Sequence, residues 1–288
     1  MSRRHWLALI ARVLRLSVRQ PSATADLVRS SYDCIAAGYD QAWTHHMRGL
    51  SLELLDRLAP SPGARAVDLT CGTGYITAEL ARRTGARPIG VDASAGMLEV
   101  ARREHGQACD FVQADALEYL RSLPDASAEV ITCGWGLGYT RPWKVIGQAA
   151  RVLRQGGRLA VIDNSLFSLA GIIWCAVQTF AERPADLEHV MKVRFLPSGR
   201  LLACMMAARG LRAGQVTDGR KTYVVSDGQA AIARLTATGA AAGFEFAARP
   251  QARDQVFARF ARNLDRRRSA GQGIEITHRY LSAIGQKR

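Results

Sequence analysis

Between residues 64 and 163 the sequence alternates short apolar runs with segments of helical periodicity. Strands that alternate with helices at such spacings form parallel βαβ units with right-handed crossovers. The alternation therefore predicts an α/β fold built on a parallel sheet. Each run ends at a turn residue, and the five predicted strands are Ala66–Leu69, Pro88–Val91, Asp110–Val112, Glu129–Cys133 and Arg158–Ile162. Two later runs, Gly243–Ala248 and Ile274–Ile284, are predicted as the sixth and seventh strands.

The chain is long enough for one large domain with an elaborated lid. It has 288 residues, of which 48% are hydrophobic, and a chain of this size can bury a full core. Residues 1–60 have helical patterns, and the sequence shows no internal repeat. We predict a basic amphipathic N-terminal helix over residues 1–30, a main domain over residues 31–288, and a lid insertion within it over residues 165–222.

The most informative stretch covers residues 66–75 and reads AVDLTCGTGY. It is a predicted strand that enters a glycine turn and then a helix starting near Ile76. Glycine suits this turn because the chain must bend sharply and let a ligand touch backbone N–H groups. Gly72 and Gly74 alone are weak evidence, since many α/β proteins carry such a turn. Asp92, 18 residues after Gly74, ends the next predicted strand, where its carboxylate can accept hydrogen bonds from ribose hydroxyls.

Two details indicate which nucleotide such a site would bind. Thr77 stands where a dinucleotide-binding turn has its third glycine, which disfavours a pyrophosphate ligand. Asp115 closes the third predicted strand, where a carboxylate can accept a hydrogen bond from the exocyclic amine of adenine. Strand ends that carry Gly-x-Gly, Asp and Asp in this order indicate an adenosyl ligand without pyrophosphate.

These segments resemble the class I S-adenosylmethionine-dependent methyltransferases, in particular the small-molecule type of ubiquinone and menaquinone biosynthesis. Residues 68–74 resemble their motif I, residues 90–98 the region after strand two, and residues 114–116 the adenine-binding turn. Residues 151–159 are similar to the helix and turn before strand five. The pairs Tyr32-Asp33 and Tyr39-Asp40 resemble the Tyr-Asp pair that closes over the cofactor.

The resemblance covers about residues 30–163 and implies both a fold and a cofactor. The fold is a Rossmann-like seven-stranded, mostly parallel sheet with an antiparallel edge strand, N-terminal helices and a lid insertion after strand five. The cofactor is S-adenosyl-L-methionine. The residues expected to bind it are Tyr39, Asp68, Cys71, Gly72, Thr73, Gly74, Asp92, Ala93, Asp115, Ala116 and Cys133.

Two segments depart from the family pattern. Thr70 stands where the family usually has the first glycine of motif I. The threonine narrows the backbone turn, but the two later glycines are still present. After the fourth strand, residues 133–139 read CGWGLGY in place of the usual polar stretch. Trp135 and Tyr139 are either an aromatic wall beside the transferred methyl group, holding the sulfonium by cation–π contact, or ordinary packing under a glycine-rich loop.

Methyl transfer from a sulfonium needs in-line approach by a nucleophile, so positioning can supply most of the rate. A base is needed only where the acceptor holds its proton. The candidate bases are His45 and His46, on the predicted helix after Tyr39, and Asp163, at the end of strand five. A structural role is the alternative for each of them.

The acceptor is expected to contact the lid insertion. Residues 165–181 are 17 residues without a charge. This length is at the bottom of the ~17–25 range for a membrane-spanning helix, and the preceding strand makes a span topologically awkward. We predict instead a helix that roofs an apolar acceptor pocket, with an inner face formed by Phe167, Ile172, Trp174 and Phe180. The acceptor is then lipophilic, either a quinone precursor, an isoprenoid or a phospholipid, with Phe167 and Trp174 as contacts, while plain core packing is the alternative.

Positive charge gathers at the two ends of a chain whose formal net charge is +14. Residues 1–20 carry five arginines and no acid, and residues 249–288 carry ten Lys or Arg against three acids. At about 100° per residue, most of the N-terminal arginines share one arc of a helix whose remaining surface is apolar. This helix is either interfacial, on an anionic membrane surface, or docked on its own domain with the arginines toward water.

Two other functions stay open. A nucleic-acid methyltransferase would use the basic stretch Arg259–Arg268, with Phe257 and Phe260 between the arginines, but no RNA-binding module is appended and a nucleic-acid partner is not expected. The second alternative function is that of a protein that binds S-adenosylmethionine without turnover.

The six cysteines show no C-x-x-C pair and no histidine at zinc spacing, which predicts no metal site. With reduced thiols and no secretory signal, we expect a cytoplasmic protein, peripheral at the membrane if its first helix is interfacial. The oligomeric state does not follow from the sequence.

Overall fold

The computed structural model describes residues 3–19, 24–240, 244–267 and 273–288, so Gly243 and Arg268, which bound two predicted segments, lie outside the described residues. The chain divides into two compact units. We call one the sheet unit, and it comprises Tyr32–Phe167, Val193–Gly219 and Arg279–Arg288. We call the other the helical unit, and it comprises Met1–Ser31, Ser168–Lys192 and Arg220–His278.

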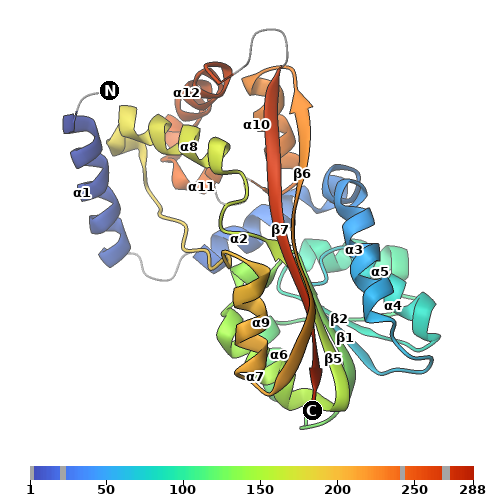
Figure 1. The fold of residues 1–288 in the computed structure, drawn as a ribbon. Coiled ribbons are helices and arrows are strands. Elements are labelled where there is room, and N and C mark those ends of the chain that lie inside the picture. The colour runs from blue at the N-terminus through green and yellow to red at the C-terminus, as the bar shows by residue number, and fades with distance from the viewer. Residues whose placement is uncertain (1–2, 20–23, 241–243, 268–272) are drawn as a thin grey trace. The chain divides into compact units, whose positions relative to one another are not determined.

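Across the described residues the sheet has seven strands, in the order β3-β2-β1-β4-β5-β7-β6 (Figure 1). Strands β1 to β5 pair in parallel, whereas β7 pairs antiparallel to β5, with Asp163 opposite Leu281. The predicted Rossmann-like fold, mostly parallel with antiparallel pairing toward one edge, is confirmed. The strands are β1 Ala66–Leu69, β2 Ile89–Asp92, β3 Asp110–Gln113, β4 Ala128–Gly134, β5 Leu153–Asn164, β6 Leu211–Val225 and β7 Ile274–Lys287.

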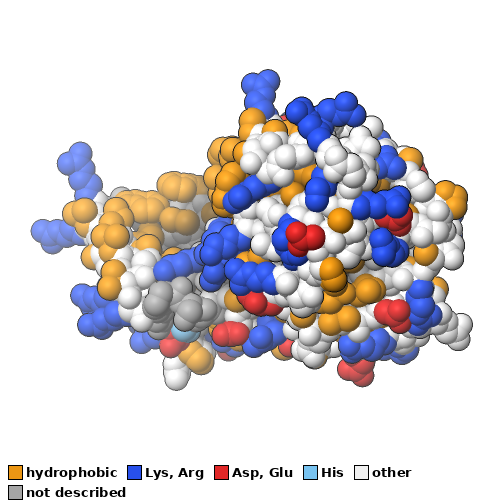
Figure 2. All heavy atoms as spheres, turned by 90° about the horizontal axis from the view of Figure 1, so that it is seen from below, with side chains coloured by type: hydrophobic (Ala, Val, Ile, Leu, Met, Phe, Trp, Pro, Cys, Tyr) orange, Lys and Arg blue, Asp and Glu red, His pale blue; other side chains and the backbone are white. Residues whose placement is uncertain are grey.

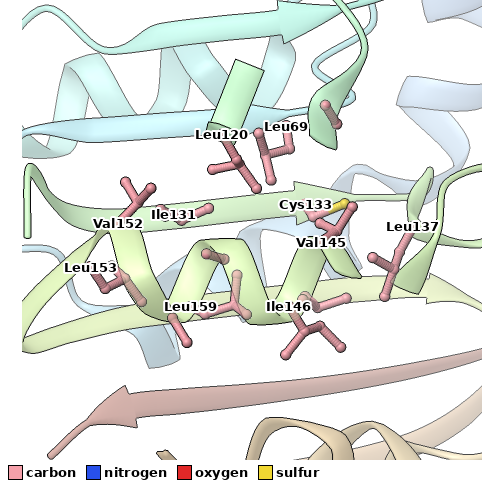
Figure 3. Packing of buried hydrophobic residues seen from close by; sticks show 14 of the residues in the cluster. Leu69, Leu120, Ile131, Cys133, Leu137, Val145, Ile146, Val152, Leu153 and Leu159 are labelled. Atoms are coloured by element: carbon pink, nitrogen blue, oxygen red, sulfur yellow. The ribbon is translucent and has the colours of Figure 1, made fainter. Parts of the chain in front are cut away.

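Helices cover both faces of the parallel strands. On one face α6, α7 and α9 share a buried cluster with the strands, and on the other face α3 and α4 do so. Figure 3 shows members of the first cluster packed between strands and helices, among them Leu69, Leu120 and Ile146. The helices of the sheet unit are α3 His45–Leu58, α4 Tyr75–Thr84, α5 Ala95–His105, α6 Ala116–Ser122, α7 Pro142–Val152 and α9 Gly199–Ala207, with the short turns η1 Ala36–Gly38, η2 Asp40–Thr44 and η3 Leu137–Tyr139. Helix α2, Thr24–Ile35, has residues in both units.

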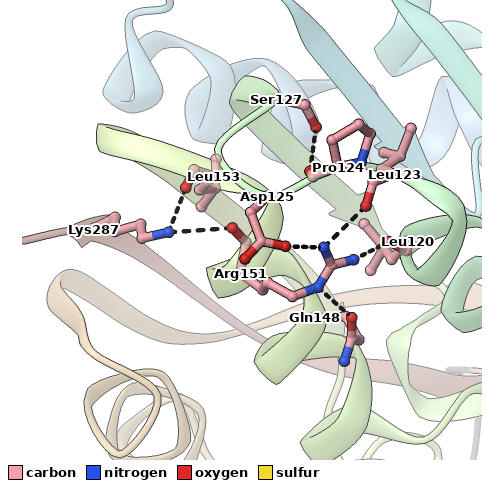
Figure 4. A network of polar contacts seen from close by, with 9 residues as sticks. All are labelled: Leu120, Leu123, Pro124, Asp125, Ser127, Gln148, Arg151, Leu153 and Lys287. Atoms are coloured by element: carbon pink, nitrogen blue, oxygen red, sulfur yellow. Dashed lines mark hydrogen bonds and ion pairs between the residues drawn. The ribbon is translucent and has the colours of Figure 1, made fainter.

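The Arg151 side chain ties the end of α7 to the loop after α6 (Figure 4). Its guanidinium donates to the carbonyl oxygen of Leu120 at 2.7 Å and forms an ion pair with Asp125. Carbonyl groups at a helix C-terminus have no partner within the helix, so this arginine supplies a donor that α6 cannot. Lys287 Nζ donates to the carbonyl oxygen of Leu153 at 2.6 Å and fastens the end of β7 to the start of β5.

The helical unit packs around two buried clusters. Leu9 and Leu16 of α1 lie in one cluster with Phe180 of α8, and Ile172 of α8 lies in the other with Phe260 of α12. Its elements are α1 Arg3–Arg19, α8 Ala170–Glu182, η4 Pro184–Asp186, α10 Gly228–Ala237, α11 Phe244–Ala247, η5 Pro250–Ala252 and α12 Arg253–Asp265.

Asp186 links three elements of the helical unit through arginines. Its carboxylate is 1% exposed and accepts hydrogen bonds from Arg249 at 2.9 Å and Arg259 at 2.5 Å. Burial raises the pKa of Asp186, but these hydrogen bonds outweigh it and leave the pKa below its usual value. The Arg259 guanidinium is therefore engaged inside the unit.

The prediction of one helix over residues 165–181 is wrong at its start. Helix α8 begins only at Ala170, and residues 166–169 form turns. Leu169 has φ +57° and ψ +23°, a left-handed conformation that cannot continue a right-handed helix from residue 165. Phe167 consequently precedes the helix, whereas Trp174 lies within it.

The segment predicted as the sixth strand is helical, because α11 covers Phe244–Ala247. The sixth strand is β6, at the edge of the sheet. Its residues alternate between more and less exposed positions, so it buries little apolar surface and carries a weak hydrophobic pattern.

The predicted lid insertion, residues 165–222, has residues in both units. The domain boundaries drawn from the sequence stay a prediction. In the described part of the chain, no helix has the combined length and apolarity to cross a membrane.

Candidate functional site

The candidate site lies in the sheet unit, at the carboxyl ends of β1 to β4. The strand register brings these ends level. Leu69 pairs with Val91 on one side and Cys133 on the other, and Asp92 pairs with Gln113. The loops that follow these strands therefore start side by side, where open α/β sheets bind their ligands.

The loop after β1 has left-handed backbone conformations. The φ angle is +53° at Thr70, +55° at Gly72 and +86° at Gly74, a region that favours glycine. A Cβ atom on Gly74 would lie 2.9 Å from Cζ of Phe111, so packing also requires glycine there. A Cβ atom on Gly72 would meet no atom within 4 Å. Gly72 is therefore where a ligand can approach the main chain, and the preceding Cys71 is buried beside it.

Asp68 organises this loop from inside the protein. Its carboxylate is fully buried and accepts hydrogen bonds from the hydroxyls of Thr77 and Thr132, both at 2.7 Å. Burial raises the pKa of Asp68 to about 6, although both hydroxyls lower it. Asp68 thus joins β1 to α4 and β4, and its predicted contact with the cofactor stays a prediction.

Asp92 connects the ends of β1 and β2. One carboxylate oxygen accepts from the backbone N–H of Gly72 and the other from that of Ser94, each at 2.9 Å. Burial raises the pKa of Asp92 despite these hydrogen bonds. Each carboxylate oxygen has a further lone pair, so Asp92 keeps acceptor capacity beside the open side of Gly72.

Asp115 occupies the end of β3. Its Oδ1 accepts hydrogen bonds from the backbone N–H groups of Leu117 and Glu118 and caps α6. Both bonds use the same oxygen, so the second carboxylate oxygen can serve a ligand. Ala93 is exposed after β2, and Ala116 is buried at the start of α6. These residues fit an adenosyl group, since they offer acceptors for hydroxyls and an amine beside an accessible backbone.

Two aspartates bind the end of α2 and the segment that follows it to these loops. Asp33 accepts hydrogen bonds from the Ser94 hydroxyl at 2.6 Å and the Gly96 N–H at 3.0 Å. Asp40 accepts from the Thr73 hydroxyl at 2.6 Å. Both acids belong to the Tyr-Asp pairs found in the sequence, and they hold residues 32–44 against two strand-end loops.

The tyrosines of these pairs form an aromatic cluster with Tyr139, in which Tyr32 is central. Tyr32 makes edge-to-face contacts with Tyr39 and Tyr139, each with ring centroids 5.9 Å apart, and Tyr139 contacts Phe195 at 5.2 Å. Burial raises the pKa of all three phenols, to about 12 for Tyr139, so they are neutral hydroxyls at pH 7. The charge of Asp92 also raises the pKa of Tyr32 and Tyr39.

Trp135 belongs to a different aromatic cluster from Tyr139. Its indole Nε1 donates to the Ser51 hydroxyl at 3.0 Å, and its ring contacts Trp43 at 5.5 Å and Tyr280 at 6.3 Å. The structure therefore packs Trp135 against α3 and β7 and places Tyr139 with the tyrosines. The role of either ring as an acceptor contact stays a prediction.

Among the three candidate bases, Asp163 alone is buried at a strand end. Its Oδ2 accepts from the backbone N–H of Gly138 at 2.6 Å and its Oδ1 from that of Asn164 at 2.8 Å. Burial raises the pKa of Asp163 to about 7, although both backbone groups lower it. His45 is exposed and His46 is half-buried, both in the first turn of α3.

The two departures from the family pattern touch each other. The Thr70 hydroxyl lies 3.4 Å from Sγ of the buried Cys133. A Cβ atom on Gly136 would lie 2.5 Å from Oγ1 and 2.6 Å from Cβ of Thr70. The larger residue in the first loop thus requires glycine in the second.

The two predicted acceptor contacts of the lid belong to different units. Phe167 is 56% exposed in the sheet unit. Trp174 is 48% exposed on α8 of the helical unit, and its ring stacks on Trp6 with centroids 5.4 Å apart. Their role in an acceptor pocket stays a prediction.

Residues from other segments support the site without a sequence pattern that marks them. Thr77 and Thr132 hold Asp68, and Phe195 packs on Tyr139. The one available signal is the repeated Tyr-Asp pair, whose aspartates fasten the site, because hydroxyl and ring contacts between distant segments leave no local pattern.

Comparison with known proteins identifies the central segment. Residues 66–157 match a family model described as a methyltransferase domain, and residues 10–109 match that of protein-L-isoaspartate(D-aspartate) O-methyltransferase. The chain is 35% identical over 153 residues to a demethylmenaquinone methyltransferase of Clavibacter sepedonicus. That match covers 51% of this chain and 58% of the relative, so the chain spans little more than half the relative's length.

Solved structures share the fold. The YcgJ protein of Bacillus subtilis superimposes with a TM-score of 0.58 at 20% identity, covering 83% of this chain and 99% of that one. A geranyl diphosphate C-methyltransferase of Streptomyces coelicolor gives a TM-score of 0.51 at 15% identity, covering 84% and 79%. The predicted resemblance to S-adenosylmethionine-dependent class I methyltransferases is confirmed by the domain match over residues 66–157, by the curated relatives and by the shared fold.

Replacing Gly136 by Ala is expected to lower the free energy of unfolding by about 1–3 kcal/mol, because the added methyl group overpacks against Thr70. In the presence of Thr70→Gly the same change should cost little, since the obstructing side chain is gone. Urea unfolding of the wild type, both single variants and the double variant gives the coupling energy. Additive effects within about 0.5 kcal/mol would show that the two loops do not depend on each other.

Proposed function

We propose that this chain transfers a methyl group from S-adenosylmethionine to a lipophilic small molecule. The observation that carries the proposal is the level arrangement of the Gly72 loop, Asp92 and Asp115 at adjoining strand ends. The acceptor is a quinone precursor, an isoprenoid or a phospholipid. The matched methyltransferase domain supports methyl transfer as the reaction. The residues around the site support a lipophilic acceptor.

In this proposal the chain binds and orients the donor, which supplies an electrophilic methyl group on a positively charged sulfur. Asp92 accepts hydrogen bonds from the ribose hydroxyls, and Asp115 accepts from the adenine amine. The backbone around Gly72 and Thr73 approaches the amino-acid end. The remaining cofactor-binding residues are Tyr39, Asp68, Cys71, Gly74, Ala93, Ala116 and Cys133.

The lipophilic acceptor is supported by the aromatic character of the strand ends. Tyr32, Tyr39, Tyr139 and Phe195 present ring surfaces, and the three phenols are neutral hydroxyls. Such a surface excludes water and can align a flat or isoprenoid acceptor for in-line attack. Names of relatives agree with this chemistry, since one is a demethylmenaquinone methyltransferase and one structural neighbour acts on geranyl diphosphate. Trp135 and Phe167 of the sheet unit are included in the proposal as further acceptor contacts.

We assign the base, where the acceptor requires one, to Asp163. Its pKa of about 7 lets it accept a proton near neutral pH, which is the condition for efficient general base catalysis. His45 and His46 are the alternatives, and neither has a comparable position at a strand end in the structure.

We further propose that the protein is cytoplasmic and binds an anionic membrane surface through residues 1–20. A nucleic-acid acceptor has less support, because Phe260 is 3% exposed and Arg259 donates to the buried Asp186. These side chains, which would form the basic aromatic surface, are committed to the interior of the helical unit.

Mass spectrometry of a lipid extract incubated with the protein and methyl-labelled S-adenosylmethionine tests the proposed function. We expect label in an apolar species, formed together with S-adenosylhomocysteine, and much less label when Asp92→Ala replaces the wild type at a low donor concentration. Label in RNA supplied in parallel would favour the nucleic-acid alternative. Binding of the donor without any S-adenosylhomocysteine formed would favour a binding protein.

Asp92→Ala is expected to weaken S-adenosylmethionine binding by about 1.5–3 kcal/mol, the scale for hydrogen bonds to a charged group. Titration calorimetry measures the change. Asp110→Ala is the matched control, because this exposed aspartate on β3 pairs with Arg87 on the surface and should leave the affinity unchanged. Equal affinities for wild type and Asp92→Ala would remove Asp92 from the site.

The ratio kcat/KM is expected to rise as pH increases through about 7, because only the ionised carboxylate of Asp163 can accept a proton. Asp163→Asn should lower kcat by about 100-fold and abolish this rise. Rate measurements across pH on both proteins test the assignment. If the variant keeps the shape of the profile and merely melts at lower temperature, Asp163 only positions η3.

A further inference from the structure

The N-terminal helix α1 has a wide apolar arc, of which only one half is covered. Leu9 and Leu16, each 6% exposed, pack into the helical unit. The other half points outward, and its large side chains are exposed to 65% at Leu7, 53% at Ile10, 63% at Leu14 and 82% at Val18. Docking on the helical unit therefore leaves a second apolar face on the same helix.

These four exposed side chains form a single line, which we call the α1 ridge. At about 100° per residue they fall within an arc of about 80° along the length of the helix. Single exposed aliphatic side chains are common on soluble proteins, but four on one arc of one helix create a continuous surface that water disfavours. The docked interpretation of the sequence thus accounts for only one half of the apolar arc of α1.

Basic side chains border the α1 ridge. Arg4, Arg15 and Arg19 are exposed, and α1 contains no acid. Arg12 differs, because its Nε donates to the carbonyl oxygen of Leu187 at 2.9 Å within the helical unit. Figure 2 shows hydrophobic and basic side chains next to one another at the end of the view where α1 lies.

Helix α8 adds an aromatic ring beside α1. Trp174 stacks on Trp6 with an interplanar angle of 17° and stays 48% exposed, and Ile173 is 51% exposed. Tryptophan is enriched at membrane interfaces because its ring suits the boundary between headgroups and acyl chains. The surface thus combines aliphatic, indole and guanidinium groups.

We propose that the α1 ridge inserts into the headgroup region of an anionic membrane, with Arg4, Arg15 and Arg19 against the lipid phosphates. This inference rests on the proposed function in one respect, because the membrane would be the source of the lipophilic acceptor. A second copy of the chain fits less well, because a two-fold contact along the ridge would bring the same basic border against itself. An anionic lipid can cover the apolar α1 ridge with its acyl chains and pair with the arginines through its phosphate.

Sedimentation with vesicles of phosphatidylcholine and phosphatidylglycerol, in about a 2:1 ratio, tests the contact without any acceptor or turnover. The wild type should bind, and added salt should weaken binding. Leu7→Ser/Leu14→Ser should bind at least about tenfold more weakly, since each leucine loses its apolar contact with lipid. Leu201→Ser/Val224→Ser is the matched control, because these exposed side chains lie outside α1 and should leave binding unchanged.

Equal sedimentation of the ridge variant and the control variant would overturn the proposal. So would light scattering that shows a wild-type dimer converted to a monomer by the ridge variant without any vesicle binding. If the ridge variant melts at a much lower temperature than the wild type, Arg4→Gln/Arg15→Gln decides instead, since it leaves the ridge intact. That variant must lose affinity for the anionic vesicles while its weak binding to pure phosphatidylcholine vesicles stays the same. Because turnover is not measured, failure of methyl transfer does not affect the outcome.

Discussion

The buried carboxylate of Asp68 holds together the part of the sheet on which the site depends. Its hydrogen bonds from Thr77 and Thr132 fix the end of β1 against α4 on one side and β4 on the other. A buried carboxylate costs free energy unless it is hydrogen-bonded, so these partners and the carboxylate require one another. The loop that carries Gly72 starts from this fixed point, and Asp92 then sets its backbone by accepting from the Gly72 N–H.

The best predicted strands are those with buried centres. Buried parallel strands read as nearly continuous apolar runs, which is why β1 coincides with the predicted Ala66–Leu69 and the ends of β2 and β4 lie within one residue of the predicted ends. The edge strand β6 was not predicted, because its residues alternate in exposure and few of them are apolar. The start of α8 was predicted wrongly, because it depends on the left-handed backbone conformation of Leu169, which a leucine in the sequence does not predict.

The site divides in the same way between local and tertiary signals. The spacing of Gly72, Asp92 and Asp115 indicates a nucleotide at three strand ends because each residue follows its own strand directly. The bond from Ser94 to Asp33 joins residues 61 apart, and sequence offers only the neighbouring tyrosine as a hint. Compensation between the loops after β1 and β4 is also tertiary. Each departure from the family pattern looks like a weakness by itself, and together they form one packed contact.

Three poorly solvated carboxylates near the carboxyl ends of β1, β2 and β5 give the site a negative field within a chain of net charge +14. Burial raises the pKa of Asp68, Asp92 and Asp163, and the charge of Asp92 raises that of Asp68 further. Like charges in a poorly solvated site cost free energy, which a cationic ligand relieves. The proposed donor carries a sulfonium charge that is lost once the methyl group has left. The same field would therefore favour the donor over its demethylated product, although the outer surface of the protein is basic.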